Sequence, residues 1–129
     1  MCNLTKKTNL KTVVIYKAVR KIDDKFYGNI AGTEVKLGKV IPQQEQNILF
    51  HWARVFRSEH SAYFNKNMIG KCSGLATEEN AHLLSGNNIV LKITLSGTIW
   101  RGTAKDISRD ISERAVIYAG TQILSIEEV

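Results

Sequence analysis

The sequence predicts an α+β protein, a mostly antiparallel sheet of about seven short strands with two short helices. Three observations support this prediction. Residues 89–100 alternate between apolar and polar side chains, residues 12–22 are rich in β-branched side chains, and a helix-capping residue precedes each of two short segments that begin with acids. A chain of 129 residues is expected to form a single domain, spanning 1–129.

A β-hairpin is predicted near the start of the chain. Its first strand covers residues 12–22, where Val, Ile and Thr suit a pleated surface. Asp23 and Asp24 follow as a turn signal, so residues 25–27 are expected to return as the second strand. Residues 33–37 alternate well enough for one more short strand.

The two helices are predicted from their caps. Ser58 is an N-cap candidate for a helix over 59–67, and Thr77 for a helix over 78–84, with glutamates in both first turns. The apolar run 48–56 suits either a buried strand or the start of a helix, because runs this short do not separate the two. We favour a strand there.

The clearest strand covers residues 89–100, which have one apolar and one polar face, as in an antiparallel sheet with one side in water. Gly97 within it predicts a bulge or a turn. Two further strands, 115–118 and 122–126, are expected after it, separated by Gly120.

The composition is that of an ordinary globular protein, with 43% hydrophobic and 23% charged residues. No apolar run approaches the ~20 residues of a membrane helix, and the start of the chain lacks the apolar region of a secretory signal. We therefore expect a cytoplasmic location in a host cell and no membrane association. Residues 1–11, which are polar and basic, are expected to form a flexible arm.

The positive charge is concentrated in the first third of the chain. Residues 1–39 hold nine Lys or Arg against three Asp or Glu, an excess equal to the net charge of +6 of the whole chain. Such a basic segment points to a polyanionic partner. The residues predicted to bind it are Lys6, Lys7, Lys11, Lys17, Arg20 and Lys21. The alternative is that these lysines serve only solubility.

Two clusters combine tryptophan with arginine. One contains Trp52, Arg54 and Arg57, and the other is Trp100 with Arg101. A flat ring for stacking and a guanidinium for bidentate phosphate contact are what a nucleotide ligand needs. The alternative is that both tryptophans belong to the core while the arginine tips reach solvent.

No catalytic or metal-binding signature is present. The chain has neither a GxSxG nor an HExxH motif, and Cys2 and Cys72 do not form a CxxC pair. We therefore expect no catalytic residues, no metal and no cofactor. If the protein is an enzyme, His51 or His60 is the candidate general base.

The order of several short motifs resembles a loose group of small phage and bacterial α+β proteins of mostly uncharacterised function. The matching segments are Val14-Ile15-Tyr16-Lys17, Gly38-Lys39-Val40, Phe50-His51 with Ser58 and Ala62, and the stretch from Ile93 to Ile99. The resemblance implies a mobile-element origin and transfers no catalytic residues. It also implies a role as an inhibitor in the conflict between phage and host.

The leading hypothesis is a non-enzymatic phage or mobile-element protein, with a counter-defence role, that binds an anionic nucleotide or nucleic acid. The first alternative is a protein–protein inhibitor that docks on an acidic host protein through its basic segment. The second is a small nucleotide- or phosphodiester-processing enzyme. A homodimer is compatible with all three.

Overall fold

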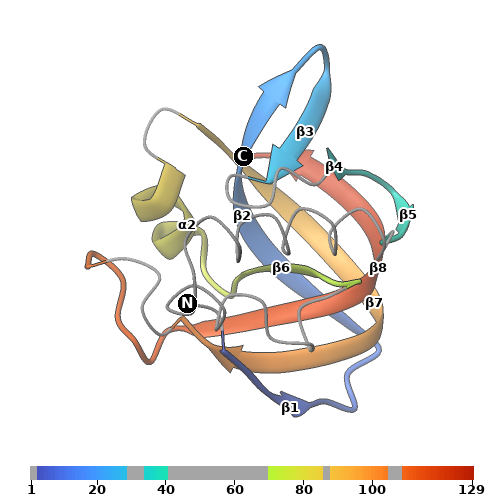
Figure 1. The fold of residues 1–129 in the computed structure, drawn as a ribbon, viewed down its shortest axis with the longest axis vertical. Helices are drawn as coiled ribbons and strands as arrows, with labels where there is room; N and C mark the ends of the chain where they lie inside the picture. Colours follow the sequence, from blue (N-terminus) through green and yellow to red (C-terminus); the bar gives the residue numbers. More distant parts are fainter. Residues whose placement is uncertain (1–2, 29–33, 41–69, 86–87, 105–108) are drawn as a thin grey trace, which may run out of the picture.

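A computed structural model describes residues 3–28, 34–40, 70–85, 88–104 and 109–129 of the chain. These residues form one antiparallel sheet of eight strands and one helix (Figure 1). In chain order the elements are β1 (Asn3–Lys7), β2 (Thr12–Ile22), β3 (Lys25–Gly28), β4 (Glu34–Val35), β5 (Gly38–Lys39), β6 (Cys72–Leu75), α2 (Glu78–Ser85), β7 (Ile89–Thr103) and β8 (Val116–Glu128).

Strand β7 is the centre of the sheet. It pairs with β8 along nearly its whole length, from Leu91 to Thr103. β7 also pairs with two other strands. It pairs with β2 from Ile89 to Ser96 and with β1 from Trp100 to Thr103. Since a strand has two edges, β2 and β1 occupy the edge of β7 opposite β8, one after the other.

The sheet closes on itself through β6. This short strand pairs with β8 and also with β2, where Tyr16 lies opposite Leu75. Strands β2, β7, β8 and β6 therefore form a hydrogen-bonded ring, visible as the strongly curved sheet in Figure 1. Gly74 makes the close approach possible, because a Cβ there would lie 2.8 Å from both the Ile15 side chain and the Tyr16 carbonyl oxygen.

Two bulges accompany the bending of the long strands. In β7, Gly97 has φ +79 and lies at a register shift between Ser96 and Ile99, so the predicted bulge is confirmed. In β8, Thr94 pairs with Ser125 and Leu95 with Ile123, which leaves Leu124 as the extra residue. Bulges increase local bending and twist, as closure of the sheet requires.

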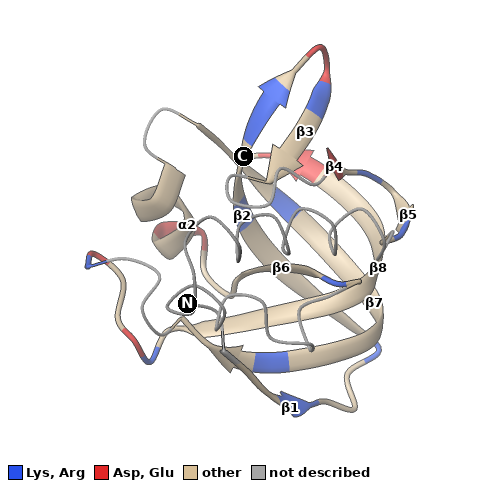
Figure 2. Ribbon diagram, in the orientation of Figure 1, with Lys and Arg blue, Asp and Glu red and all other residues tan. Residues whose placement is uncertain are grey.

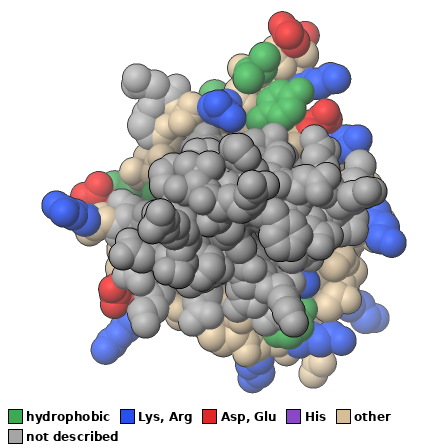
Figure 3. All heavy atoms as spheres, viewed as in Figure 1, with side chains coloured by type: hydrophobic (Ala, Val, Ile, Leu, Met, Phe, Trp, Pro, Cys, Tyr) green, Lys and Arg blue, Asp and Glu red, His purple; other side chains and the backbone are tan. Residues whose placement is uncertain are grey.

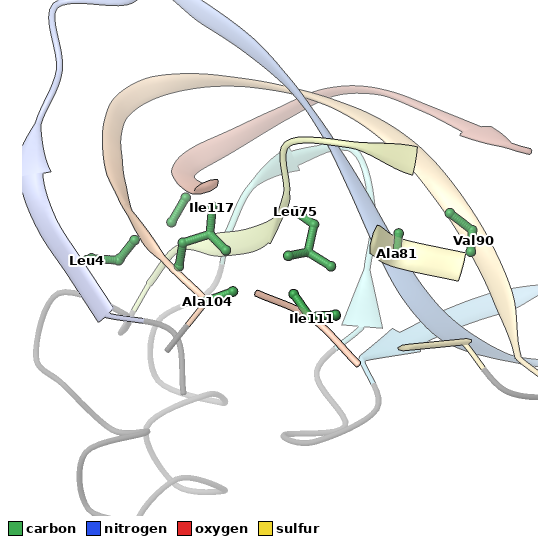
Figure 4. Close-up of a cluster of buried hydrophobic side chains, with 8 residues drawn as sticks. Leu4, Leu75, Ala81, Val90, Ala104, Ile111 and Ile117 are labelled. Carbon is green, nitrogen blue, oxygen red and sulfur yellow. The ribbon is translucent and has the colours of Figure 1, made fainter. Parts of the chain in front are cut away.

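Apolar side chains pack on both faces of the β2–β7 pair. Ile15 and Val19 of β2 belong to one buried cluster, whereas Tyr16 packs against the other. Successive side chains of a strand point to opposite faces, so the two clusters lie on opposite sides of the sheet there. The second cluster is drawn in Figure 4, and helix α2 adds Ala81 to it.

Several predictions are confirmed. The fold is mostly antiparallel sheet and is dominated by strands. Strand β2 has the predicted bounds, the turn at Asp23 and Asp24 joins it to β3, and α2 matches the helix predicted over 78–84. The predicted strand 48–56 and the helix 59–67 lie outside the described residues.

Two predictions are wrong. The arm predicted over 1–11 contains β1, because Leu4 is buried to 2% exposure and the strand pairs with β7. Gly120 does not divide the last segment into two strands. It lies inside β8, where its lack of a side chain lets the backbone pack closely on Leu95. A short strand, β4 (Glu34–Val35), lies within the range predicted over 33–37, and residue 33 is outside the described residues.

The part of the chain that the structure describes contains no helix long and apolar enough to span a membrane.

Candidate functional site

The six lysines and arginines predicted to bind a polyanion do not form one surface. Lys6 and Lys7 lie on β1, whereas Arg20 and Lys21 lie at the far end of β2, next to the hairpin turn (Figure 2). A strand advances about 3.3 Å per residue, so roughly 33 Å of chain separates the two ends of β2, which has 11 residues. In Figure 3 the basic side chains of the described residues lie at several separate places around the rim of the view.

The basic residues near the hairpin are partly neutralised. Lys21 Nζ lies 3.5 Å from Glu128 Oε2 and 5.7 Å from the centre of the Phe26 ring. Asp23 and Asp24 form the adjacent turn. A polyanion would meet charges of both signs at this end of the molecule.

Lys17 is engaged inside the fold. Its side chain is half-buried, and Nζ donates a hydrogen bond of 2.8 Å to the carbonyl oxygen of Ser73 on β6. This lysine therefore helps to hold β6 against β2, next to the point where the ring closes. It is not part of an exposed basic surface, contrary to its predicted role.

A group of basic residues lies where β1 meets β7. Lys6 is directly opposite Arg101, and Lys7 is directly opposite Trp100. Both lysines and Arg101 are exposed. Within the described ranges, no carboxylate lies at salt-bridge distance from any of the three. We call Lys6, Lys7 and Arg101 the β1–β7 surface.

Like charges directly opposite each other on neighbouring strands destabilise a sheet. The pairing of Lys6 with Arg101 therefore carries a local cost, which is limited because both side chains are exposed to solvent. Tyr118 of β8 lies opposite Arg101 on the other side, and its ring packs against the buried cluster that contains Ile15.

Trp100 lies on the other face of β7. Its half-buried ring packs against the cluster shown in Figure 4. Lys71 Nζ lies 5.5 Å from the ring centre, a cation–π distance. Lys7 lies opposite Trp100 on β1, so an ammonium-bearing side chain is placed on each side of the tryptophan.

Lys71 reaches Trp100 across an intervening strand. It directly precedes β6, and β8 lies between β6 and β7. The β8 residues at this crossing are Ala119, opposite Trp100, and Gly120, opposite Cys72. Because both are small, the long lysine stem can pass over β8 to the indole ring.

Trp100 and Arg101 do not form one compact site. They are consecutive residues of a regular part of β7, so their side chains point to opposite faces of the sheet. One small ligand cannot be stacked by the first and held by the second on a single face. The other predicted cluster, Trp52 with Arg54 and Arg57, lies outside the described residues.

The candidate catalytic groups are placed as follows. His51 and His60 lie outside the described residues. His82 is exposed on α2, with Nε2 3.7 Å from Glu78 Oε2. Cys72 is a buried residue of β6 with 7% exposure. In the described ranges no group of three or more His, Cys, Asp or Glu is arranged to hold a metal ion.

Sequence reasoning missed two of these relationships. The pairing of Lys6 with Arg101 depends on the register of strands that lie far apart along the chain. The contact of Lys71 with Trp100 depends on the position of β6 beside β8. Neither leaves a local pattern in the sequence.

Comparisons of the chain with protein-family models, curated proteins and solved structures give no match.

Proposed function

We propose that the protein binds nucleic acid through the β1–β7 surface. The observation that supports this most directly is the pairing of Lys6 with Arg101. Two cations opposite each other cost stability in the free protein, and a bound phosphate backbone would turn that repulsion into two favourable contacts.

The residue types suit phosphate. An arginine guanidinium presents a planar fork that contacts two phosphate oxygens together, whereas a lysine acts as a flexible point charge. Lys6 and Lys7 lie next to each other on a terminal strand of the sheet, and they point to its two faces. A polyanion following β1 would meet both.

Binding of this kind has a characteristic salt dependence. Each phosphate contact releases counterions, and three contacts to a single strand give a slope of log K against log salt of about −2. Sequence preference is expected to be low, since contacts to phosphate carry no direct information about the bases.

The test is a salt titration of the binding of a fluorescent oligonucleotide, measured by anisotropy. Lys6→Gln combined with Arg101→Gln should weaken binding and reduce the slope by about 1–2. The matched control is Lys36→Gln combined with Lys39→Gln, which removes two exposed positive charges around β4 and β5. The control should leave the slope nearly unchanged.

Two results would contradict the proposal. Equal losses in both double variants would mean that only net charge matters and that no local site exists. Equal competition by polyglutamate would favour the alternative in which the basic surface docks on an acidic protein. The phage origin, the counter-defence role and the inhibitor role remain predictions from the resemblance.

A further inference from the structure

We infer that Trp100 is a stacking platform for an unpaired nucleobase, so that the ligand of this protein is single-stranded nucleic acid. The inference rests on the proposed function and gives it a substrate class. It concerns the face of β7 opposite the one that presents Arg101.

The tryptophan lies between two cationic side chains. Lys7 lies opposite it on β1, one strand spacing of about 4.8 Å away. Lys71 approaches from the other direction across Ala119, with Nζ 5.5 Å from the ring centre. An aromatic surface with an ammonium group on each side matches a nucleotide, which has a flat base and a phosphate on both sides along the chain.

The position of Lys71 over the Trp100 ring indicates what kind of group this surface can bind. A cation over an indole is attracted by the negative face of the π-system. A nucleobase that stacks on the same face would replace the ammonium as the group over the ring.

A duplex offers no such base. Its bases are stacked on each other and paired, so presenting one to Trp100 would require unstacking. Stacking on aromatic side chains together with a basic groove is how proteins hold single strands without strong sequence preference. Lys6 and Arg101 lie on the face of β1 and β7 opposite the stacking ring, whereas Lys7 lies on the same face as the ring. A single strand that passes around β1 would contact both faces.

The first experiment compares a twelve-nucleotide oligo-dT with a duplex of mixed sequence and the same length. Trp100→Leu should weaken binding of oligo-dT about tenfold or more while leaving the salt slope unchanged. Trp100→Phe, which retains a ring, should lose less. Lys71→Gln should reduce the slope by about 0.7, as expected for one lost phosphate contact.

A second measurement follows binding in the unaltered protein and uses a variant only to assign the signals. The chain contains two tryptophans, so 5-fluorotryptophan labelling gives two ¹⁹F resonances, and Trp100→Phe identifies that of Trp100. This resonance should shift when oligo-dT is added to the otherwise unaltered protein. It should shift much less with the duplex.

The outcomes separate the two proposals. If oligo-dT binds through Lys6 and Arg101 but the Trp100 resonance does not move at saturation, the stacking role is wrong and the proposed function stands. Equal affinity for oligo-dT and duplex would also overturn the preference for single strands. If neither probe binds at low salt, both proposals fail.

Discussion

The backbone N–H of Thr98 donates a hydrogen bond of 3.0 Å to the hydroxyl oxygen of Thr121. The two residues face each other across the bulge in β7, where the regular ladder between β7 and β8 is interrupted. The side chain thus supplies the acceptor that the backbone of β8 does not. Gly97 beside it leaves the space that this hydroxyl occupies.

Thr121→Val should destabilise the protein by about 1–3 kcal/mol, because a part-buried N–H is left without its acceptor. Thr121→Ser retains the hydroxyl and should lose much less. Urea unfolding of both variants gives the comparison. A larger loss in Thr121→Ser than in Thr121→Val would mean that the methyl group, and not the hydrogen bond, supports the bulge.

Leu4→Ala should cost about 2–4 kcal/mol in the free energy of unfolding, because the side chain is 2% exposed in the core. Leu10→Ala is the matched control, since Leu10 is 45% exposed and lies between β1 and β2. It should change stability by less than about 0.5 kcal/mol. A small effect at both positions would support a flexible arm after all.

Asp24→Gly should stabilise the protein by about 0.5 kcal/mol. Asp23 and Asp24 have φ values of 51 and 64 in a two-residue turn between Ile22 and Lys25, and glycine adopts that conformation without steric cost. Asp24→Asn tolerates the same conformation and removes only the charge. Thermal unfolding distinguishes them, and a gain with Asn equal to that with Gly would assign the effect to charge.

Gly74→Ala should destabilise the closed ring by about 1–3 kcal/mol, because its Cβ would overlap the Ile15 side chain and the Tyr16 carbonyl oxygen. Hydrogen exchange should show faster exchange at Leu75 and its neighbours in β6. Ser73→Ala, at the preceding residue, introduces no new atom and serves as the control. Unchanged protection in Gly74→Ala would mean that the backbone can move apart there without loss.

Lys6→Glu should raise stability and lower binding together. It replaces a like-charge pair with an opposite-charge pair facing Arg101, a change worth about 0.2–1 kcal/mol. Oligonucleotide affinity should fall in the same variant. Lys36→Glu makes an equal charge change at an exposed site outside the β1–β7 surface and should affect both quantities less. Lower stability in Lys6→Glu would remove the main support for the proposed function.

The elements predicted correctly are those encoded by neighbouring residues. Strand β2 combines a β-branched run with a turn signal at its end, and both act locally. Helix α2 begins after Thr77, whose hydroxyl accepts a hydrogen bond of 3.4 Å from the Asn80 N–H, as expected of an N-cap. Gly97 has the positive φ that its place in an apolar strand indicated.

The elements predicted wrongly depend on distant partners. The segment of β1 is polar except for Leu4, and it becomes a strand only because the edge of β7 beyond β2 is available. Gly120 looks like a break in the sequence, yet it is needed where β8 passes close to Leu95. The composition of a segment does not determine which strand will pair with it.

The candidate site residues follow from their types in the sequence, and their geometry comes from the structure. Trp100 and Arg101 were grouped because they are adjacent, although the two-residue period of a strand places them on opposite faces. Lys6 and Lys7 are candidate residues because of their charge alone. That Arg101 and Trp100 lie opposite them is known only from the register of β1 against β7. Lys71 was not identified as a site residue.

The position of β1 also affects how the chain acquires its structure during synthesis. Arg101 follows Thr5, whose hydroxyl donates to the Arg101 carbonyl oxygen, by 96 positions. At translation rates of about 5–20 residues per second, the first strand must wait roughly 5–20 s before its pairing partner exists. Strand β1 is thus among the last strands that can join the sheet. Until then its lysines are exposed on an unpaired segment in a cell rich in nucleic acid.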